Sequence, residues 1–305
     1  MARAPVVLFV YNRPEHTKKT IEALQNNYLA RETDLFVFSD GAKNDDAVPQ
    51  VNQIRNYLKT VEGFKSIHVI ERKKNYGLAK NIIYGVTKII DLYNKVIVLE
   101  DDILTSEYFL TYMNRALDKY YDHTEVMSIS GYIAPINKSE LPSTFFMPWF
   151  ECWGWGTWKR SWMLFNRNPS YQLKKSGRKD INFINVYGSD PSLWHQVIDN
   201  YRNKIKTWAI FFHVCICEHK GLVLYPKESL CRNIGFDGSG TNCNIDCSYD
   251  VKLANQDAFM LPDPDKIEPN EKAVSAFIEF NKGRIKPFDR FVYFIWRWLF
   301  ILFKH

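Results

Sequence analysis

The stretch VIVLEDDIL, residues 96–104, combines a strand pattern with an unusual ending. Its β-branched and leucine residues predict a buried strand, and three consecutive carboxylates follow directly: Glu100, Asp101 and Asp102. Neighbouring carboxylates repel one another, and burial costs them free energy unless a cation lies nearby. Two interpretations stay open at this point. The cluster is either a solvated strand end that caps the following helix, or the site of a metal or a polyhydroxylated ligand.

Strand and helix patterns alternate on both sides of this stretch. Apolar runs predict strands at 5–11, 34–40, 66–72, 95–102 and 125–132, and amphipathic segments predict helices at 15–29, 51–60, 78–93 and 106–121. Such alternation is typical of the α/β class, with a doubly wound, mostly parallel sheet.

Polar residues stand at the carboxyl ends of three predicted strands. They are Asn12-Arg13-Pro14, Ser39-Asp40-Gly41 and Glu100-Asp101-Asp102. Ligands of open α/β sheets bind in the crevice beyond these ends, so we expect the three clusters to line one crevice. The first turn has no G-x-G-x-x-G dinucleotide fingerprint, and the sequence contains no P-loop. The chemistry that remains is a nucleotide held by side chains, with its diphosphate bound through a divalent metal.

Composition narrows the class of partner and the compartment. The chain of 305 residues carries a net charge of +6, and its Lys and Arg residues are scattered. This pattern favours an anionic substrate or a membrane surface over nucleic acid. The sequence opens without a signal-peptide pattern, so the six cysteines are expected to be cytosolic free thiols. His213, Cys215, Cys217 and His219 alternate, but their spacing fits no usual zinc site.

Several segments resemble glycosyltransferases of the GT-A type. PVVLFVYNRPEHTKKTIEAL (5–24) is similar to their first strand and helix, FSDG (38–41) to their base-contacting segment, and NYGLAKN (75–81) to the segment beside the donor. LEDD (99–102) resembles their D-x-D-type metal motif, in the E-D-D form of the N-acetylglucosaminyltransferase I family. WGWGTW (153–158) and SLCRNIGFDGSG (229–240) resemble blocks of bacterial surface-polysaccharide sugar transferases.

The resemblance implies a GT-A fold and a role for each polar cluster. Asp102 would bind Mn²⁺ or Mg²⁺, with Glu100 supporting it and Asp101 near the ribose or the metal. Asp40 would accept a hydrogen bond from uracil, or is only a turn residue. The remaining substrate-binding candidates are Asn12, Arg13, Lys80, Asn81, Trp153 and Trp155. Their alternative roles are in turns, on the surface or in the aromatic core, and the sequence leaves these open.

An inverting transferase also needs a carboxylate that takes the proton of the acceptor hydroxyl. The bacterial relatives place one in a D-[ST]-W segment, which here reads Lys206-Thr207-Trp208, and Asn242 stands where they have a histidine. The candidates for the base, which the sequence does not rank, are Asp190, Glu218 and Asp237. The two departures also support an alternative function, a non-catalytic nucleotide- or glycan-binding scaffold in a polysaccharide assembly complex.

The resemblance divides the chain into three segments. Residues 1–132 would form the nucleotide-sugar-binding half, 133–285 an elaborated acceptor-binding half of the same domain, and 286–305 a C-terminal helix. Within the last, FDRFVYFIWRWLFILF (288–303) is shorter than the ~20 residues that span a bilayer, so it predicts a membrane-interface anchor or a buried helix.

The expected protein is a cytoplasmic enzyme, peripheral at the inner membrane face. It would move a hexosyl or N-acetylhexosaminyl group from a nucleotide sugar, a UDP-sugar, to an acceptor of surface polysaccharide synthesis. The expected acceptor is a saccharide or a lipid-linked saccharide.

Overall fold

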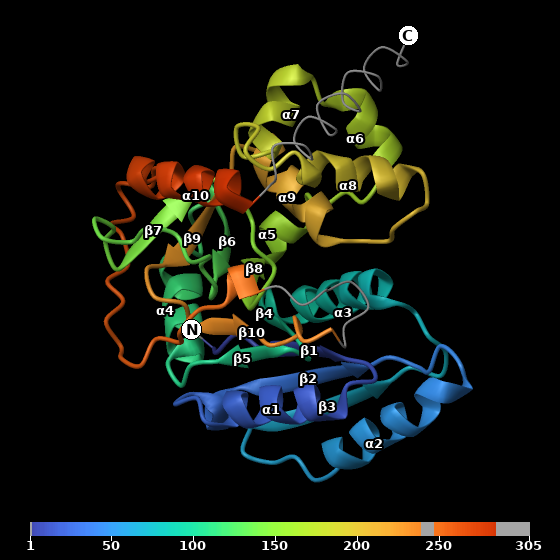
Figure 1. The fold of residues 1–305 in the computed structure, drawn as a ribbon. Helices are drawn as coiled ribbons and strands as arrows, with labels where there is room; N and C mark the ends of the chain where they lie inside the picture. Colours follow the sequence, from blue (N-terminus) through green and yellow to red (C-terminus); the bar gives the residue numbers. More distant parts are fainter. Residues whose placement is uncertain (1, 239–246, 285–305) are drawn as a thin grey trace.

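The structure, a computed structural model, describes residues 2–238 and 247–284. Its centre is an eight-stranded sheet with strand order β3-β2-β1-β4-β8-β6-β9-β7, and helices lie on both faces of this sheet (Figure 1). The predicted doubly wound, mostly parallel α/β architecture is confirmed.

The first half of the chain forms the parallel part of the sheet. β1 (Val6–Val10) pairs in parallel with β2 (Asp34–Ser39) and β4 (Lys95–Glu100), and β3 (Ser66–Glu71) pairs in parallel with β2. The helices are α1 (Pro14–Gln25), α2 (Val48–Leu58), α3 (Leu78–Tyr93) and α4 (Phe109–Lys119), with 3-10 turns η1 (Ala30–Glu32) and η2 (Asp45–Ala47). Each strand and helix predicted within residues 5–121 is therefore confirmed.

Two residues turn the chain at the carboxyl edge of this sheet. Pro14 occupies the first turn of α1, where its missing N–H would have had no helical partner. Gly77 precedes α3 with a φ of 73°, a left-handed conformation that favours glycine. The loops after β1 and β3 can therefore turn sharply into helices beside the strand ends.

The second half adds four strands to the same sheet. β8 (Trp155–Trp158) lies antiparallel between β4 and β6 (Val126–Ser130), and β9 (Leu222–Pro226) and β7 (Thr144–Met147) complete the sheet. A separate two-stranded sheet pairs β5 (Ile103–Thr105) with β10 (Cys231–Asn233). Because one sheet runs through both halves, they form one body; the division of donor and acceptor binding between them stays a prediction.

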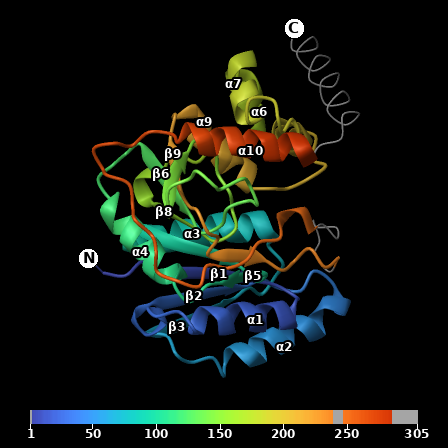
Figure 2. The ribbon, with the colours of Figure 1, turned by 60° about the vertical axis from the view of Figure 1, so that its left-hand side comes forward.

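Most helices of the second half gather at one end of the molecule. The helices of the second half are α5 (Lys159–Trp162), α6 (Pro169–Lys175), α7 (Arg178–Ile184), α8 (Ser192–Tyr201), α9 (Ala209–Glu218) and α10 (Glu271–Arg284), with the 3-10 turn η3 (Cys247–Tyr249) before α10. Figure 2 shows α6, α7, α9 and α10 at the end opposite α1 and α2. In the parts of the chain that the structure describes, no helix has the length and apolar character needed to cross a bilayer. The apolar segment 288–303 lies outside those parts.

The register of β8 brings the segment 151–154 to the carboxyl edge. The last pair between β4 and β8 is Val98 with Trp155, so the residues before Trp155 continue past the end of β4, beside the acidic cluster. Gly131 N–H donates to the Gly154 carbonyl at 2.7 Å and fixes this path. Gly154 has a φ of +69°, and a Cβ there would lie 2.2 Å from Cys231 Sγ, so the position requires glycine.

Candidate active site

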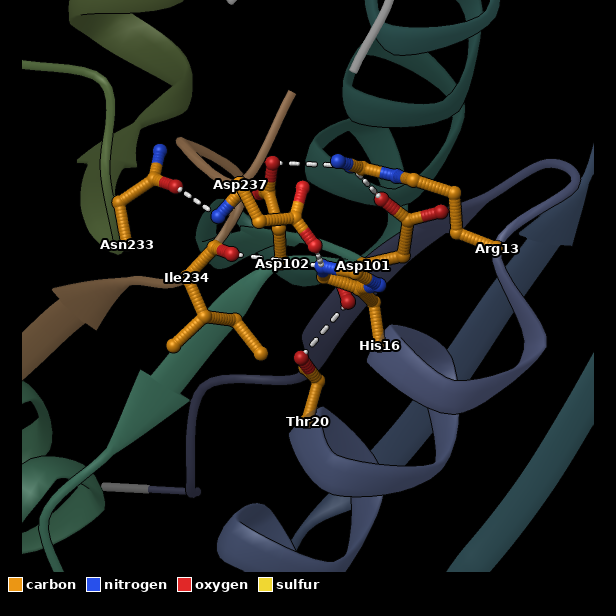
Figure 3. A network of polar contacts seen from close by, with 9 residues as sticks. Arg13, His16, Thr20, Asp101, Asp102, Asn233, Ile234 and Asp237 are labelled. Atoms are coloured by element: carbon orange, nitrogen blue, oxygen red, sulfur yellow. Dashed lines mark hydrogen bonds and ion pairs between the residues drawn. The ribbon is translucent and has the colours of Figure 1, made fainter. Parts of the chain in front are cut away.

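The acidic cluster is neutralised by an arginine from the neighbouring strand end. Asp101 and Asp102 follow β4 and are buried, and Arg13 lies in the turn between β1 and α1. One guanidinium nitrogen, Nη2, donates to Asp102 Oδ2 at 2.8 Å and also to Asp101 Oδ1 (Figure 3). β1 and β4 are parallel neighbours, so their carboxyl ends meet at one edge of the sheet. The expectation of a shared crevice for these two clusters therefore agrees with the geometry.

Burial changes the charge of this cluster. Burial raises the pKa of Glu100 to about 8, and the negative charges of Asp102 and Asp101 add to the rise. Burial also raises the pKa of Asp101 to about 6, and Arg13 opposes that rise. For Arg13, burial acts to lower the pKa, but the two aspartates raise it overall, so the guanidinium stays charged. A cation bound beside these carboxylates would oppose the rise in their pKa values.

The donor set suits a hard divalent cation such as Mn²⁺ or Mg²⁺. Carboxylate oxygens are the ligands that these ions prefer, and their sites commonly use one or two protein carboxylates. Within residues 2–238 and 247–284, no group of three or more His, Cys, Asp or Glu side chains is placed so that it could hold a metal ion. An ion bound by Asp102 and one neighbouring carboxylate would therefore need further oxygens from a ligand or water.

The segment 233–237 lies directly on this cluster. Ile234 N–H donates to the Asp102 carbonyl at 2.9 Å, and His16 Nε2 lies 3.1 Å from Asp237 Oδ2 (Figure 3). At Gly235, a Cβ would lie 2.2 Å from Asp102 Oδ2 and 3.0 Å from Arg13 Nη1, so a larger residue would displace these side chains. The described part of the block 229–240, which resembles a segment of bacterial sugar transferases, therefore covers the carboxylates. Asn242 lies outside the described residues.

Asp40 binds a loop of its own chain. Its carboxylate accepts hydrogen bonds from the backbone N–H groups of Gly41 (2.9 Å), Tyr76 (2.8 Å) and Gly77 (2.9 Å), and from Asn75 Nδ2 (3.3 Å). These four bonds use the accepting capacity of a carboxylate. Asp40 therefore orders the loop before α3 at the crevice edge. The uracil contact inferred from the resemblance stays a prediction, and it would require one of these donors to move.

Other residues expected beside the donor differ in their surroundings. Lys80 is exposed, with Nζ 4.7 Å from the centre of the Tyr76 ring. Asn81 is buried, and its Oδ1 accepts from Arg72 Nε at 3.2 Å, so its side chain holds Arg72 in place. Asn12 is part-buried in the turn after β1.

Trp153 and Trp155 differ in their surroundings. Trp155 is 1% exposed, stacks on Trp208 at 5.2 Å and packs edge-on against Phe150. The ring of Trp155 is enclosed in the core, and its expected contact with substrate stays a prediction. Trp153 is part-buried and packs edge-on against Phe236 of the segment 233–237 at 5.4 Å. Trp153 alone of the two lies beside the segment that covers the carboxylates.

The three base candidates lie in separate surroundings. Asp237 is beside the cluster, as its contact with His16 shows. Asp190 accepts from the Ser192 N–H and hydroxyl at the start of α8. Glu218, at the end of α9, pairs with Lys175 at 3.6 Å. Nearby, Cys215 and Cys217 are free thiols, as expected, and His213 bonds backbone groups.

Glu151 is a further candidate that sequence reasoning missed. It lies in the segment that continues past the end of β4, next to Phe150, whose N–H donates to His213 Nδ1 at 3.4 Å. Burial raises the pKa of Glu151 to about 7; Arg284 opposes the rise, and the negative charge of Asp190 adds to it. The negative charge of Asp190 therefore lies close enough to Glu151 to act on it. The available signal was one acid inside an otherwise aromatic and small-residue run.

The chain belongs to the Glycosyl transferase family 2, whose model matches residues 6–187, more than half of its length. It is therefore a glycosyltransferase-family protein with the GT-A fold of enzymes that use nucleotide sugars. Among curated proteins, none matches it significantly.

Solved structures similar to the chain are distant. The mannosyltransferase PcManGT from Pyrobaculum calidifontis, in complex with GDP-Man and Mn²⁺, is 11% identical with a TM-score of 0.39 and coverage of 71% of this chain and 69% of that one. TarS of S. aureus is 15% identical with a TM-score of 0.33, and the match covers 56% of this chain and 27% of TarS. A UDP-glucose pyrophosphorylase complexed with UDP-glucose is 10% identical with a TM-score of 0.36, and the match covers 73% of this chain and 90% of that one. These identities are too low to transfer a donor or an acceptor.

Proposed function

We propose that this chain is a metal-dependent, inverting glycosyltransferase that moves a sugar from a UDP-sugar to a saccharide acceptor of surface polysaccharide synthesis. The observation that supports this most is the cluster Glu100–Asp102 at the carboxyl end of β4, with Arg13 from the adjacent strand end on it. A nucleoside diphosphate is an anionic leaving group, and this edge combines carboxylates for a cation with a guanidinium for phosphate oxygens.

Asp102 would hold the divalent ion, with Glu100 or Asp101 supporting it. When bound, the ion supplies Lewis-acid neutralisation of the leaving diphosphate. Arg13 forms ion pairs with Asp101 and Asp102 in the structure. If a bound cation neutralised these aspartates, the planar guanidinium of Arg13 could donate to phosphate oxygens instead. Gly235 lets the segment 233–237 approach the carboxylates closely, which would exclude water from the donor.

The acceptor hydroxyl attacks the anomeric carbon, the bond from that carbon to the diphosphate breaks, and the hydroxyl proton goes to a base. Glu151 suits this role because it lies at the same sheet edge and its pKa of about 7 is close to neutral pH. Asp190 is the second candidate, since it interacts with Glu151. The ion pair of Glu218 with Lys175, and the exposure of the Asp237 side chain, make those two weaker candidates.

A second candidate function is a non-catalytic nucleotide- or glycan-binding scaffold. Lys206, where related enzymes carry an acid, and the occupied carboxylates of Asp101 and Asp102 favour it. For either function, we propose that the segment 286–305 attaches the protein to the inner membrane face, close to a lipid-linked acceptor. That segment follows α10 and lies outside the described residues.

A thermal-shift panel tests the choice of donor. A ligand that binds only the folded state raises the free energy of unfolding, by about 2.7 kcal/mol at a ligand concentration of 100 Kd. The melting temperature rises with it. We expect UDP-sugars with Mn²⁺ to raise the melting temperature, and GDP- and dTDP-sugars to raise it less. Equal shifts for all nucleotides, or shifts that do not depend on Mn²⁺, would contradict the proposal.

Asp40→Ala is expected to weaken UDP binding. The substitution leaves three backbone N–H groups of the loop before α3 without their acceptor, at a cost of about 1–3 kcal/mol for a buried donor. Calorimetric titration with UDP and Mn²⁺ measures the effect. Asp34→Ala, at the opposite end of the same strand, is the matched control and should bind UDP as the wild type does. An unchanged affinity of Asp40→Ala would show that this loop does not touch the nucleotide.

A further inference from the structure

A groove runs along the outer face of α3. It has a volume of about 590 Å³ and is lined by Lys80, Ile83, Tyr84, Thr87, Lys88 and Arg167. Three of these six side chains are cationic and none is acidic. Thr87 is held by Trp162, whose Nε1 donates to its hydroxyl at 2.9 Å, so α5 fixes this wall of the groove.

Among the residues that the structure describes, the cations of the groove have no carboxylate partners. Lys80, Lys88 and Arg167 form no ion pair with any residue of 2–238 or 247–284. Arg167 is nevertheless fixed in place, because its Nε donates to the Thr207 carbonyl at 2.7 Å. Burial lowers the pKa of Arg167, which reflects a guanidinium that is partly desolvated without a compensating anion.

A buried guanidinium behind the groove adds to this positive field. Arg72 is 8% exposed, and its guanidinium lies 4.2 Å from the centre of the Tyr84 ring and 4.5 Å from that of Tyr76. Its Nη2 has no hydrogen-bond partner in the described parts of the chain. Tyr84, which lines the groove, therefore has a buried and incompletely satisfied cation at its back.

Lys206 is next in the chain to the residue that holds Arg167 of the groove. Lys206 is exposed and precedes Thr207, whose carbonyl holds Arg167. Lys206 therefore adds a positive charge next to the residue that holds Arg167.

We propose that this groove binds phosphate groups, and that in the transferase they belong to the acceptor, as a pyrophosphate or a phosphodiester. Lys80 and Lys88 are eight residues apart, roughly 12 Å along the helix, which suits successive phosphates better than a single one. Arg167 offers a guanidinium suited to phosphate oxygens, and Tyr84 and Ile83 offer apolar faces to an attached sugar. α3 begins beside the loop that Asp40 holds, so the groove leads away from the proposed donor site.

The assignment to the acceptor rests on the proposed transferase function, whereas phosphate binding does not. The test is calorimetric titration of the full chain with inorganic pyrophosphate in the absence of metal. We expect pyrophosphate to bind, and its affinity to fall with added salt. Each reversed charge should lower the affinity about tenfold, so Lys88→Glu loses one such factor and Lys88→Glu/Arg167→Glu loses two. Lys19→Glu, an exposed lysine on α1, is the control and should bind pyrophosphate as the wild type does.

Titration of the same variants with UDP and Mn²⁺ separates the groove from the donor site. We expect the UDP affinity to be unchanged; if UDP binds neither wild type nor variants, the transferase proposal fails while the pyrophosphate result still decides the groove. Vesicles of phosphatidylglycerol and of phosphatidylcholine identify the source of the phosphate. Loss of phosphatidylglycerol binding in Lys88→Glu would assign a lipid headgroup, and retention would assign an acceptor phosphate. Unchanged pyrophosphate affinity in both groove variants, or an equal loss in Lys19→Glu, would overturn the proposal.

Discussion

Asp102→Asn is expected to lose Mn²⁺-dependent turnover of the nucleotide-sugar donor, by a factor on the order of 10²–10³. The substitution keeps the shape of the side chain but removes a charge from the cluster, so the cation loses its proposed ligand. Arg13 retains Asp101 as a partner, which leaves the polar network of the strand ends largely in place. Release of UDP, measured against Mn²⁺ concentration, reports the loss.

The control for this substitution is Asp91→Asn. Asp91 lies on α3, is exposed and pairs with Lys159 at 2.9 Å, so its neutralisation removes one surface charge without touching the crevice. Its turnover should equal that of the wild type. If Asp102→Asn shows the Mn²⁺ dependence of the wild type, the cluster is a structural strand end and not the metal site.

Glu151→Gln is expected to lower transfer to the acceptor by about 10²–10⁴-fold while leaving UDP affinity unchanged, because a general base acts in the transition state. The pH profile gives the sharper readout. A base must be ionised to accept a proton, so kcat/KM of the wild type should fall as the pH drops below about 7, the pKa of Glu151. In Glu151→Gln, kcat/KM should not show this fall at acidic pH.

Asp190→Asn separates the roles of Asp190 and Glu151. The negative charge of Asp190 raises the pKa of Glu151, so its removal should move the acidic limb to lower pH while transfer continues. Glu228→Gln, an exposed residue paired with Lys138, is the matched control. If Asp190→Asn abolishes transfer and Glu151→Gln does not, the two roles are reversed and Asp190 is the base.

The first half of the fold could be predicted because its strands are continuous apolar runs that end in polar turns. β8 could not, since WGTW contains one glycine and two large aromatic residues that are also compatible with a loop over a ligand. Its place between β4 and β6 depends on pairing with residues nearly sixty positions earlier in the chain. The burial of Trp155 follows from that pairing, and the sequence left open whether this ring lies in the core or beside a ligand.

The candidate site, like the fold, could be predicted only in part from the sequence. The strand-end rule brought Arg13 and the acidic cluster together, because β1 and β4 are neighbours in the sheet. The ion pairs between them, and the four bonds that Asp40 accepts, depend on side-chain geometry that no spacing in the sequence encodes. Glu151 was missed because only the register of β8 places it at the crevice edge.

Metal-dependent transfer by this chain is tested by release of UDP from a panel of UDP-sugars, with Mn²⁺ and with a chelator, for the wild type and for Asp102→Asn. We expect release by the wild type with Mn²⁺ from at least one donor, and release near the uncatalysed rate with the chelator and in the variant. Tight binding of UDP with no release from any donor would contradict the transferase assignment and favour the scaffold. Release that persists in Asp102→Asn would contradict the assignment of the site.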